Sequence, residues 1–276
     1  MTVLMLWREG PAQRLWLTSD SRLSHSGKGG GFVKLTDRAA KLLEADLILQ
    51  CRNPNGPPIA KKTVGIAYAG SSLVALQSYA AVLPLWSRLC SSGEQTLPTI
   101  GECAEHLGQF VRAYTFELAA AGDINCRTEC LLLGYNEGAE SAEAWHIYAR
   151  PGSTGVALNI ERLELGAGEM MLFGSGRAEA SRQLKKLKPT NGQWRHEPID
   201  MLRAQLRHDT PSSVGGGVQI GMLNPSGFEL VSDVRYFTAG DSAAGDSLLS
   251  MHYRGFNLEE VNKVGHCFGA LAGINT

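Results

Sequence analysis

The residue with the clearest chemical potential is the threonine at position 2. A threonine after Met1 is small enough for methionine aminopeptidase to remove the methionine, which would expose the amine of Thr2. That amine would serve as general base for the hydroxyl of the same residue, so such a nucleophile needs no histidine. An unperturbed α-amine titrates at about pH 7.7–8.0, close to working pH. Retention of Met1 would turn the amine into an amide and remove the base, and Thr2 would then be an ordinary second residue.

The other residue types that often carry chemistry form no recognisable site. Six cysteines are scattered without a CxxC pair, and Cys126 and Cys130 have no second ligand pair at a spacing typical of zinc sites. The seven histidines include no HExxH motif. The run Gly215–Gly217 precedes an expected strand rather than a helix, which argues against nucleotide binding. The sequence therefore predicts no metal and no cofactor.

Composition and charge indicate a soluble enzyme. Of the 276 residues, 43% are hydrophobic and 19% charged, and the formal net charge is −1. No global field favours nucleic acid or an anionic membrane. The first apolar run, Val3–Trp7, ends at Arg8, and no apolar stretch is long enough to cross a bilayer. We expect reduced thiols and a cytoplasmic protein with neither nucleic-acid nor membrane partners.

Hydrophobic periodicity divides the chain into groups of strands and pairs of helices. Turn residues at Glu9–Pro11 predict an opening hairpin, and glycine and proline predict loops at 27–31 and 53–58. Strands are predicted at 3–7, 15–17, 41–50, 63–69, 129–135, 144–149, 156–160, 170–173, 217–223 and 228–232. Helices are predicted at 71–90, 99–120, 177–188 and 198–208, with a further short helix at 258–264.

Two helix pairs inserted between strand groups are incompatible with a simple alternating parallel sheet. This order predicts an α+β fold, a four-layer αββα sandwich with two antiparallel sheets between two helical layers. We assign residues 1–235 to this domain and residues 236–276 to a C-terminal extension of unknown role.

Four local patterns occur in the order found in one known family. They are Thr2–Leu6 with Thr18–Arg22; Lys41–Ala45; Tyr68–Ser71; and Phe173–Gly176 with Asp209–Ser212 and Gly215–Val218. Together they resemble the proteasome β-subunit family of N-terminal-nucleophile (Ntn) hydrolases, in its bacterial proteasome-like branch, over residues 2–231. Two departures are a longer stretch between Lys41 and Gly70, and Val3 where the family has a second threonine.

The resemblance implies a complete catalytic set around Thr2. A lysine ammonium near the amine would favour the neutral, basic form of that amine, and an aspartate would keep the lysine charged and oriented. Lys41 fits the family's strand pattern better, although Lys34 fits the spacing from Asp20 almost equally well. The N–H of Gly70 would face the oxyanion. The implied catalytic residues are Thr2, Asp20, Lys41, Gly70, Ser175, Asp209 and Ser212.

These residues predict an amide hydrolase, and the resemblance implies a threonine-type peptidase that acts on peptides or proteins as a homo-oligomeric ring. The sequence does not decide whether an ATPase partner delivers substrate to this ring. An alternative enzyme keeps the same nucleophile but hydrolyses a small amide. A third possibility is a catalytically silent assembly subunit, as proteasome α-subunits are. Those subunits carry an extra N-terminal helix that is absent before Val3, which favours the active class.

Overall fold

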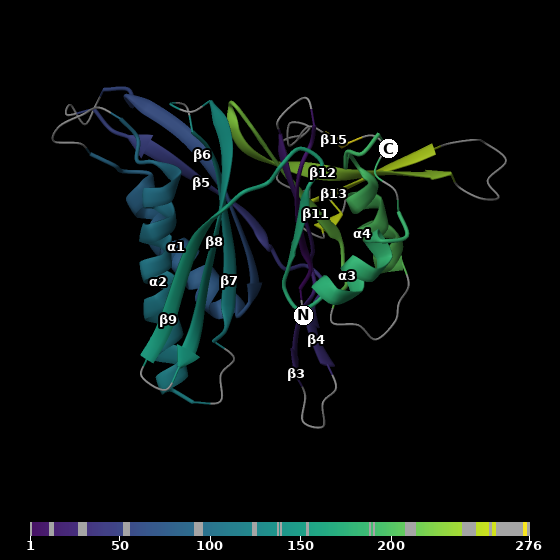
Figure 1. The fold of residues 1–276 in the computed structure, drawn as a ribbon, viewed down its shortest axis with the longest axis horizontal. Coiled ribbons are helices and arrows are strands. Elements are labelled where there is room, and N and C mark those ends of the chain that lie inside the picture. The colour runs from purple at the N-terminus through teal and green to yellow at the C-terminus, as the bar shows by residue number, and fades with distance from the viewer. Residues whose placement is uncertain are drawn as a thin grey trace.

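The structure is a computed structural model of the 276-residue chain. It describes all residues except 1, 11–13, 27–31, 52–55, 91–95, 123–125, 137, 139, 153–154, 188, 190, 208–213, 239–246, 254–255, 258–272 and 275–276. The described residues form three sheets and four helices, and strand pairing within the sheets is antiparallel apart from one short parallel pair. Of the predicted α+β fold, the combination of helices with antiparallel sheets is confirmed (Figure 1).

One sheet contains five strands that follow one another in chain order. They are β5 (Leu42–Leu49), β6 (Ala60–Gly70), β7 (Thr128–Asn136), β8 (Ser141–Gly152) and β9 (Gly155–Leu163). Strand β5 lies at one edge of this sheet, and its side chains alternate between two environments. Leu43, Ala45 and Leu47 are buried in a hydrophobic cluster, whereas the intervening Glu44 and Asp46 are only partly buried.

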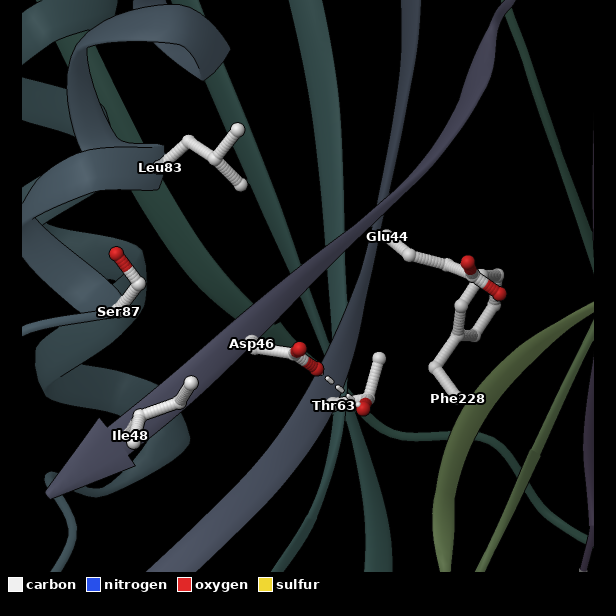
Figure 2. Close-up of a pocket in the computed structure, with 7 residues that line it drawn as sticks. All are labelled: Glu44, Asp46, Ile48, Thr63, Leu83, Ser87 and Phe228. Atoms are coloured by element: carbon white, nitrogen blue, oxygen red, sulfur yellow. Dashed lines mark hydrogen bonds between the residues drawn. The ribbon is translucent and has the colours of Figure 1, made fainter. Parts of the chain in front are cut away.

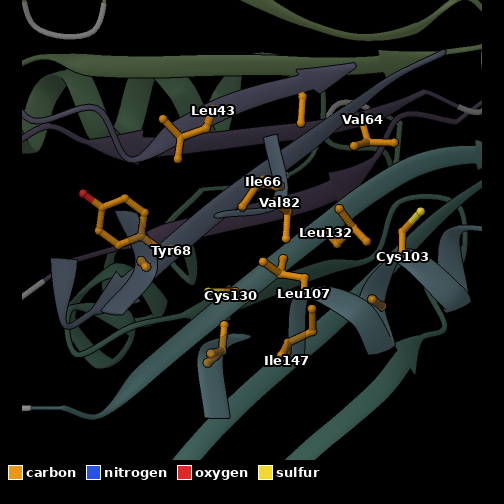
Figure 3. Packing of buried hydrophobic residues seen from close by; sticks show 14 of the residues in the cluster. Leu43, Val64, Ile66, Tyr68, Val82, Cys103, Leu107, Cys130, Leu132 and Ile147 are labelled. Carbon is orange, nitrogen blue, oxygen red and sulfur yellow. The ribbon is translucent and has the colours of Figure 1, made fainter. Parts of the chain in front are cut away.

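Helices α1 (Ser72–Trp86) and α2 (Ile100–Ala120) cover this sheet. The Ser71 hydroxyl caps α1, and Thr99 with Glu102 forms a reciprocal capping box at the start of α2. Figure 3 shows the buried cluster that joins both helices to the strands. Labelled members from the strands and helices are Leu43, Val64, Ile66, Tyr68, Val82, Cys103, Leu107, Cys130, Leu132 and Ile147.

The larger sheet brings the two halves of the chain together. Its path begins β10 (Met170–Phe173), β1 (Leu4–Arg8), β2 (Leu15–Asp20), β11 (Val218–Asn224) and β12 (Gly227–Thr238). It continues through β13 (Ser247–Tyr253) and β14 (Phe256–Asn257), and β15 (Gly273–Ile274) pairs in parallel with β12. The strand that ends at Asp20 therefore lies between β1 and β11, so it has a paired strand on each side.

Helices α3 (Arg177–Leu184) and α4 (Glu197–Arg207) pack on the larger sheet. Their buried side chains form a cluster with strand residues that include Met5, Trp7 and Trp16, and the two indole rings stack with centroids 6.2 Å apart. A further cluster contains side chains from both large sheets. Its strand members include Leu4, Leu6, Leu15, Leu17, Leu42, Ala67, Ala69, Leu131 and Leu133.

Several predicted bounds need correction. Strands β3 (Leu23–Ser26) and β4 (Phe32–Thr36) form a separate two-stranded sheet where we predicted only two sheets. The signal was weak because β4 is exposed along most of its length and so shows no alternation of buried residues. Helix α1 ends at Trp86 rather than at 90 and runs through Pro84, and α3 ends at Leu184 rather than at 188.

The chain beyond residue 235 continues the larger sheet through β13–β15, while the predicted helix at 258–264 lies outside the described residues. The division into a domain of residues 1–235 and an extension of residues 236–276 stays a prediction.

Candidate active site

The centre of the candidate site is Asp20, the last residue of β2, whose side chain is fully buried. Its Oδ1 accepts hydrogen bonds from the Lys41 ammonium at 2.9 Å and from the backbone N–H of Val3 at 3.1 Å. Its Oδ2 accepts from the backbone N–H groups of Gly215 at 3.1 Å and Arg22 at 3.2 Å. Because four donors converge on the two oxygens, the carboxylate is held in one orientation.

The structure pairs Asp20 with Lys41 and not with Lys34. Lys41 directly precedes the edge strand β5, and its side chain is fully buried. Burial lowers the pKa of the Lys41 ammonium, and Asp20 opposes this shift by stabilising the charged form. Lys34 lies in β4 with 60% of its side chain exposed and pairs with Asp37 at 3.2 Å. Lys41 is therefore the lysine that reaches the predicted aspartate.

Thr2 lies directly beside this ion pair. The residue is 5% exposed, and the N–H of the next residue, Val3, shares Asp20 Oδ1 with the Lys41 ammonium. The Thr2 carbonyl accepts a hydrogen bond from the Gly176 N–H at 2.9 Å. Thr2 is thus held between the end of β2 and the start of α3. Met1 is outside the described residues.

The turn Gly174–Gly176 closes over Thr2. Gly174 has a positive φ of 79°, and a Cβ at this position would come within 2.3 Å of the Thr2 carbonyl oxygen. Only glycine therefore allows the turn to approach this closely. Gly176 is the N-cap of α3, while the predicted Ser175 is exposed between the two glycines. Ser175 therefore lies between two glycines that approach the Thr2 carbonyl, and Ser175 itself is exposed to solvent.

Gly70 ends β6 at the turn into α1, as the sequence suggested. Its φ is 97°, and an added Cβ would lie 2.2 Å from the Arg127 carbonyl oxygen. The adjoining strand end approaches Thr2, because a Cβ built on Gly174 would lie 3.2 Å from the Ala69 Cβ and 2.3 Å from the Thr2 oxygen. Asp209 and Ser212, the two remaining predicted residues, lie outside the described residues.

Two residues that bond to this site were missed from the sequence, and a third, Tyr68, lies close enough to be affected by the charge of Asp20. Gln219 of β11 bonds through its side chain to the backbone of Lys41, and the Glu129 carboxylate accepts the Gly174 N–H at 3.2 Å. The Tyr68 hydroxyl is buried and has no hydrogen-bond partner among the described residues. Burial, and then the charges of Cys130 and Asp20, raise the pKa of this hydroxyl. The one available signal was a polar residue, Gln219, in an otherwise apolar strand.

A pocket of about 370 Å³ lies elsewhere, between β5, β6, α1 and β12 (Figure 2). The residues that line it are Glu44, Asp46, Ile48, Thr63, Leu83, Ser87 and Phe228. Its acidic groups already have partners. Glu44 Oε1 accepts the Leu230 N–H at 2.6 Å, and Asp46 accepts from the Thr63 hydroxyl at 2.7 Å. This pocket therefore contains none of the residues that the sequence predicted to be catalytic.

The described residues also bear on two other kinds of site. No three histidine, cysteine, aspartate or glutamate side chains in the described part of the chain lie together in a way that could hold a metal ion. Within the same part of the chain, no helix combines the length and apolar character needed to span a membrane.

Comparisons with known proteins place the fold but not the function. No protein-family model and no curated protein sequence matches the chain. A solved structure titled Anbu (ancestral beta-subunit) from Yersinia bercovieri is similar, with a TM-score of 0.51 and 16% identity over 80% of this chain and 81% of that one. Anbu from Hyphomicrobium sp. strain MC1 gives a TM-score of 0.50 and 15% identity, over 83% of this chain and 84% of that one. At such identities the likeness shows a shared fold alone.

These neighbours correct the family assignment made from the sequence. The chain was expected to be a member of the proteasome β-subunit family, in its bacterial proteasome-like branch, and that assignment is wrong. Anbu is a distinct family and a proteasome-like relative. The motifs that carried the resemblance are short and lie mainly at glycine turns and strand ends.

Proposed function

We propose that the chain is an N-terminal-nucleophile hydrolase of amide bonds in which Thr2, freed of Met1, supplies both the nucleophile and the base. The observation that carries the proposal is the fully buried Asp20–Lys41 ion pair beside Thr2. A buried pair is weak evidence of stabilisation, because desolvating two charges offsets their attraction. Its position against the second residue therefore supports a chemical role.

The cation has a specific use at this position. A lysine ammonium near an α-amine favours the neutral form of that amine, which is the form able to accept a proton. Asp20 holds the ammonium through Oδ1, and the same oxygen fixes the backbone immediately after Thr2. One carboxylate oxygen thus couples the position of the cation to the position of the nucleophile.

The proposed reaction has two steps. The Thr2 amine takes the hydroxyl proton as Oγ1 bonds to the substrate carbonyl carbon, and collapse of the tetrahedral intermediate breaks the C–N bond. The leaving amine takes that proton, and an acyl ester remains on Thr2. In the second step the amine takes a proton from water as the water oxygen attacks the ester. The proton returns to Oγ1 and the carboxylic acid leaves.

We assign the oxyanion donor to the N–H of Gly70. The support is that the β6 end adjoins Thr2 through the turn at Gly174 and that Gly70 adopts the positive φ of a sharp strand-to-helix turn. Preorganised backbone donors of this kind contribute roughly 3–4 kcal/mol to transition-state stabilisation. We assign supporting roles to Ser175, Asp209 and Ser212.

The proposal includes the four-layer αββα sandwich. Three hydrophobic clusters support it: one between α1–α2 and the five-stranded sheet, one containing both large sheets, and one between the larger sheet and α3–α4. In Figure 1, α1–α2 and α3–α4 lie on opposite sides of the two sheets.

We further propose a peptide or protein substrate and a homo-oligomer of this chain. Support for self-association comes from α1, which has no charged residue and exposes Leu73, Leu76 and Leu83 along one side. The spacing of these leucines matches the seam along which like helices pack. Sedimentation of the full chain at micromolar concentration should give a multiple of the 29.7 kDa monomer mass, and a stable monomer would contradict this part.

Substitution of Thr2 tests the function directly. Thr2→Ala should abolish hydrolysis of a peptide-amide library and labelling by a threonine-directed electrophile, because no hydroxyl remains. Thr2→Ser keeps both the hydroxyl and the amine, so it should retain part of the activity. Both variants should still fold, because each removes only one or two atoms and leaves the backbone hydrogen bond of the Thr2 carbonyl in place.

Intact-mass measurement supplies the control on the base. A preparation in which Met1 is retained should be as inactive as Thr2→Ala, because its nitrogen is an amide. Full activity in a preparation shown to retain Met1 would overturn the mechanism. A native protein that begins at Thr2 yet neither hydrolyses amides nor reacts with the electrophile would favour the silent assembly subunit. Hydrolysis restricted to small amides would overturn the peptidase assignment but would leave the assignment of Thr2 as the nucleophile intact.

A further inference from the structure

The backbone around Lys41 is held by a side chain from a distant part of the sequence. The N–H groups of Lys41 and Leu42 both donate to Oε1 of Gln219, at 2.9 and 3.2 Å. Gln219 lies in β11, 178 residues beyond Lys41. Because β5 is an edge strand of its sheet, N–H groups at its beginning need a partner other than a neighbouring strand. The Gln219 amide supplies that partner.

The amide nitrogen of Gln219 holds the other side of the same region. Its Nε2 donates to the Ala39 carbonyl at 2.7 Å and to the Asp20 carbonyl at 3.4 Å. An amide side chain has two donor hydrogens and two acceptor lone pairs, and Gln219 uses all four. The residue is 3% exposed, so water does not substitute for these partners. If the Gln219 amide were flipped, its NH₂ group would face the N–H groups of Lys41 and Leu42, and its oxygen would face the two carbonyls. The hydrogen bonds therefore fix its orientation.

The backbone of Gln219 is itself anchored to the strand that ends at Asp20. Gln219 pairs with Ser19 in the β2–β11 ladder, and its carbonyl accepts a hydrogen bond from the Thr18 hydroxyl at 2.8 Å. One side chain thus connects the backbone of the aspartate, the residues that precede Lys41, and Lys41 itself. These are the segments whose relative position determines whether the ammonium reaches Asp20.

We propose that Gln219 is a positioning residue, which sets the Lys41 ammonium against Asp20 by clamping the backbone on both sides of Lys41. This inference rests on the proposed function for its catalytic meaning. Its structural content concerns the Lys41 backbone and the titration of the Lys41 side chain, and both are measurable without any hydrolysis.

The test compares the full chain with Gln219→Met, which keeps the approximate length and volume of the side chain but makes none of the four hydrogen bonds. Amide hydrogen exchange at Lys41 and Leu42 should become about tenfold faster, as expected for loss of one buried hydrogen bond each. Exchange at Leu131 and Leu132 of β7 should stay unchanged. Unchanged exchange at Lys41 and Leu42, or a parallel rise at all four positions, would overturn the proposal.

Side-chain titration gives a readout that a merely structural role would not move. In Gln219→Met, water should reach the relaxed Lys41 segment, and the pKa of the ammonium should shift upward toward its ordinary value because burial is what lowers it. Nitrogen-15 NMR of the Lys41 Nζ measures this shift. Identical titration in the wild type and the variant would contradict the clamp.

Thr18→Val is the matched control. It removes a buried hydrogen bond to the same residue, from the Thr18 hydroxyl to the Gln219 carbonyl, but leaves the side-chain amide in place. Local stability should fall while the Lys41 exchange and titration stay as in the wild type. A Thr18→Val variant that shifts the Lys41 titration as much as Gln219→Met would show that general loosening, and not the amide, is responsible.

A second variant keeps the test decisive if Gln219→Met fails to fold. Gln219→Glu retains both acceptor contacts to Lys41 and Leu42 but presents lone pairs to the Ala39 and Asp20 carbonyls. The added carboxylate should raise the pKa of the Lys41 ammonium. If hydrolysis is established, kcat should fall with KM unchanged, since substrate contacts are untouched. A Gln219→Glu protein with wild-type Lys41 titration would overturn the proposal, whatever the outcome of the Thr2 substitutions.

Discussion

Among the described residues, two buried ion pairs involve carboxylates of the larger sheet, and they differ in the cation and in what lies beside them. Asp20 and Lys41 are both fully buried and meet at 2.9 Å. Arg203 of α4 and Asp233 of β12 are 8% and 1% exposed, and Arg203 Nε meets the carboxylate at 2.9 Å. Arg203 also bonds to Asp200 within its own helix at 2.8 Å.

The cations differ in what they are able to do. A guanidinium keeps its proton in proteins and binds carboxylates in a fixed planar geometry, which suits a permanent link between α4 and β12. An ammonium is a compact charge whose pKa responds to burial, and burial lowers the pKa of Lys41. The two pairs are similar in burial and distance, and the lysine pair shares Asp20 Oδ1 with the N–H of Val3, directly after Thr2. Location and the choice of cation, rather than burial, distinguish them.

Removing the cation from either pair should produce the largest loss of unfolding free energy among these predictions. Lys41→Met and Arg203→Met each remove the cation of a buried ion pair, which costs roughly 3–5 kcal/mol of unfolding free energy. Urea unfolding measures this loss. Hydrolysis per folded molecule should be abolished only in Lys41→Met, because Lys41 bonds to the carboxylate that holds the backbone after Thr2, whereas Arg203 bonds to Asp200 and Asp233.

Paired neutral replacements separate charge burial from chemistry. Asp20→Asn with Lys41→Met, and Asp233→Leu with Arg203→Met, should each recover part of the lost stability, since both charges of the buried pair are then removed. Hydrolysis per folded molecule should persist in the Arg203 pair and stay absent in the Lys41 pair. Equal loss of hydrolysis in both would mean that the Asp20–Lys41 pair acts only through folding.

The pH dependence of stability should also differ between the pairs. The pKa of Lys41 is lowered in the folded state, while a lysine in an unfolded chain titrates at about 10.4. Between these two values the unfolded chain binds more protons than the folded chain. The unfolding free energy attributable to Lys41 therefore rises as pH rises through this window. This contribution is measured as the difference in unfolding free energy between the wild type and the neutral Asp20→Asn/Lys41→Met variant, from pH 7 to 10.

The Arg203 pair provides the reference for that slope. The difference in unfolding free energy between the wild type and the neutral Asp233→Leu/Arg203→Met variant should not change with pH over this range, because a guanidinium does not lose its proton. A Lys41 difference that is flat or falls with rising pH would contradict the direction of its pKa shift.

The parts of the site that the sequence predicted depend on local pattern. The hairpin that ends at Asp20, the glycine at the end of β6 and the glycine turn before α3 each have a short signature, because backbone geometry there restricts the residue type. The choice of Lys41 over Lys34 depended on the strand that follows it, and the structure pairs Asp20 with Lys41.

Long-range partners could not be predicted in the same way. Gln219 contacts Lys41 across 178 residues, and no spacing rule links a strand glutamine to a backbone N–H so far away. The Glu129 contact with Gly174 depends likewise on how β7 meets the turn before α3. The family assignment failed for a related reason. Short motifs at strand ends report a fold, and the similar solved structures share the fold at 15–16% identity.

A third ion pair is only partly buried, and breaking it should give the smallest loss of unfolding free energy. Arg22 Nε meets the Asp37 carboxylate at 2.5 Å, and the Asp37 side chain is 32% exposed. The hydrogen bond from Arg22 is the main cause that lowers the pKa of Asp37. The stabilisation is therefore present above the ordinary pKa of about 3.9 and is lost as pH falls through the lower folded-state value.

Asp37→Asn removes the charge while leaving the backbone carbonyl that accepts the Ser21 hydroxyl. Because solvent screens partly exposed pairs, the unfolding free energy at pH 7 should fall by less than about 1 kcal/mol, and by still less in 1 M salt. Urea unfolding at low and high salt measures both changes. Hydrolysis should be unaffected, since Asp20 keeps its contact with the Arg22 backbone. A loss as large as that of Arg203→Met would mean that pairing itself, and not the degree of burial, sets the cost of breaking these ion pairs.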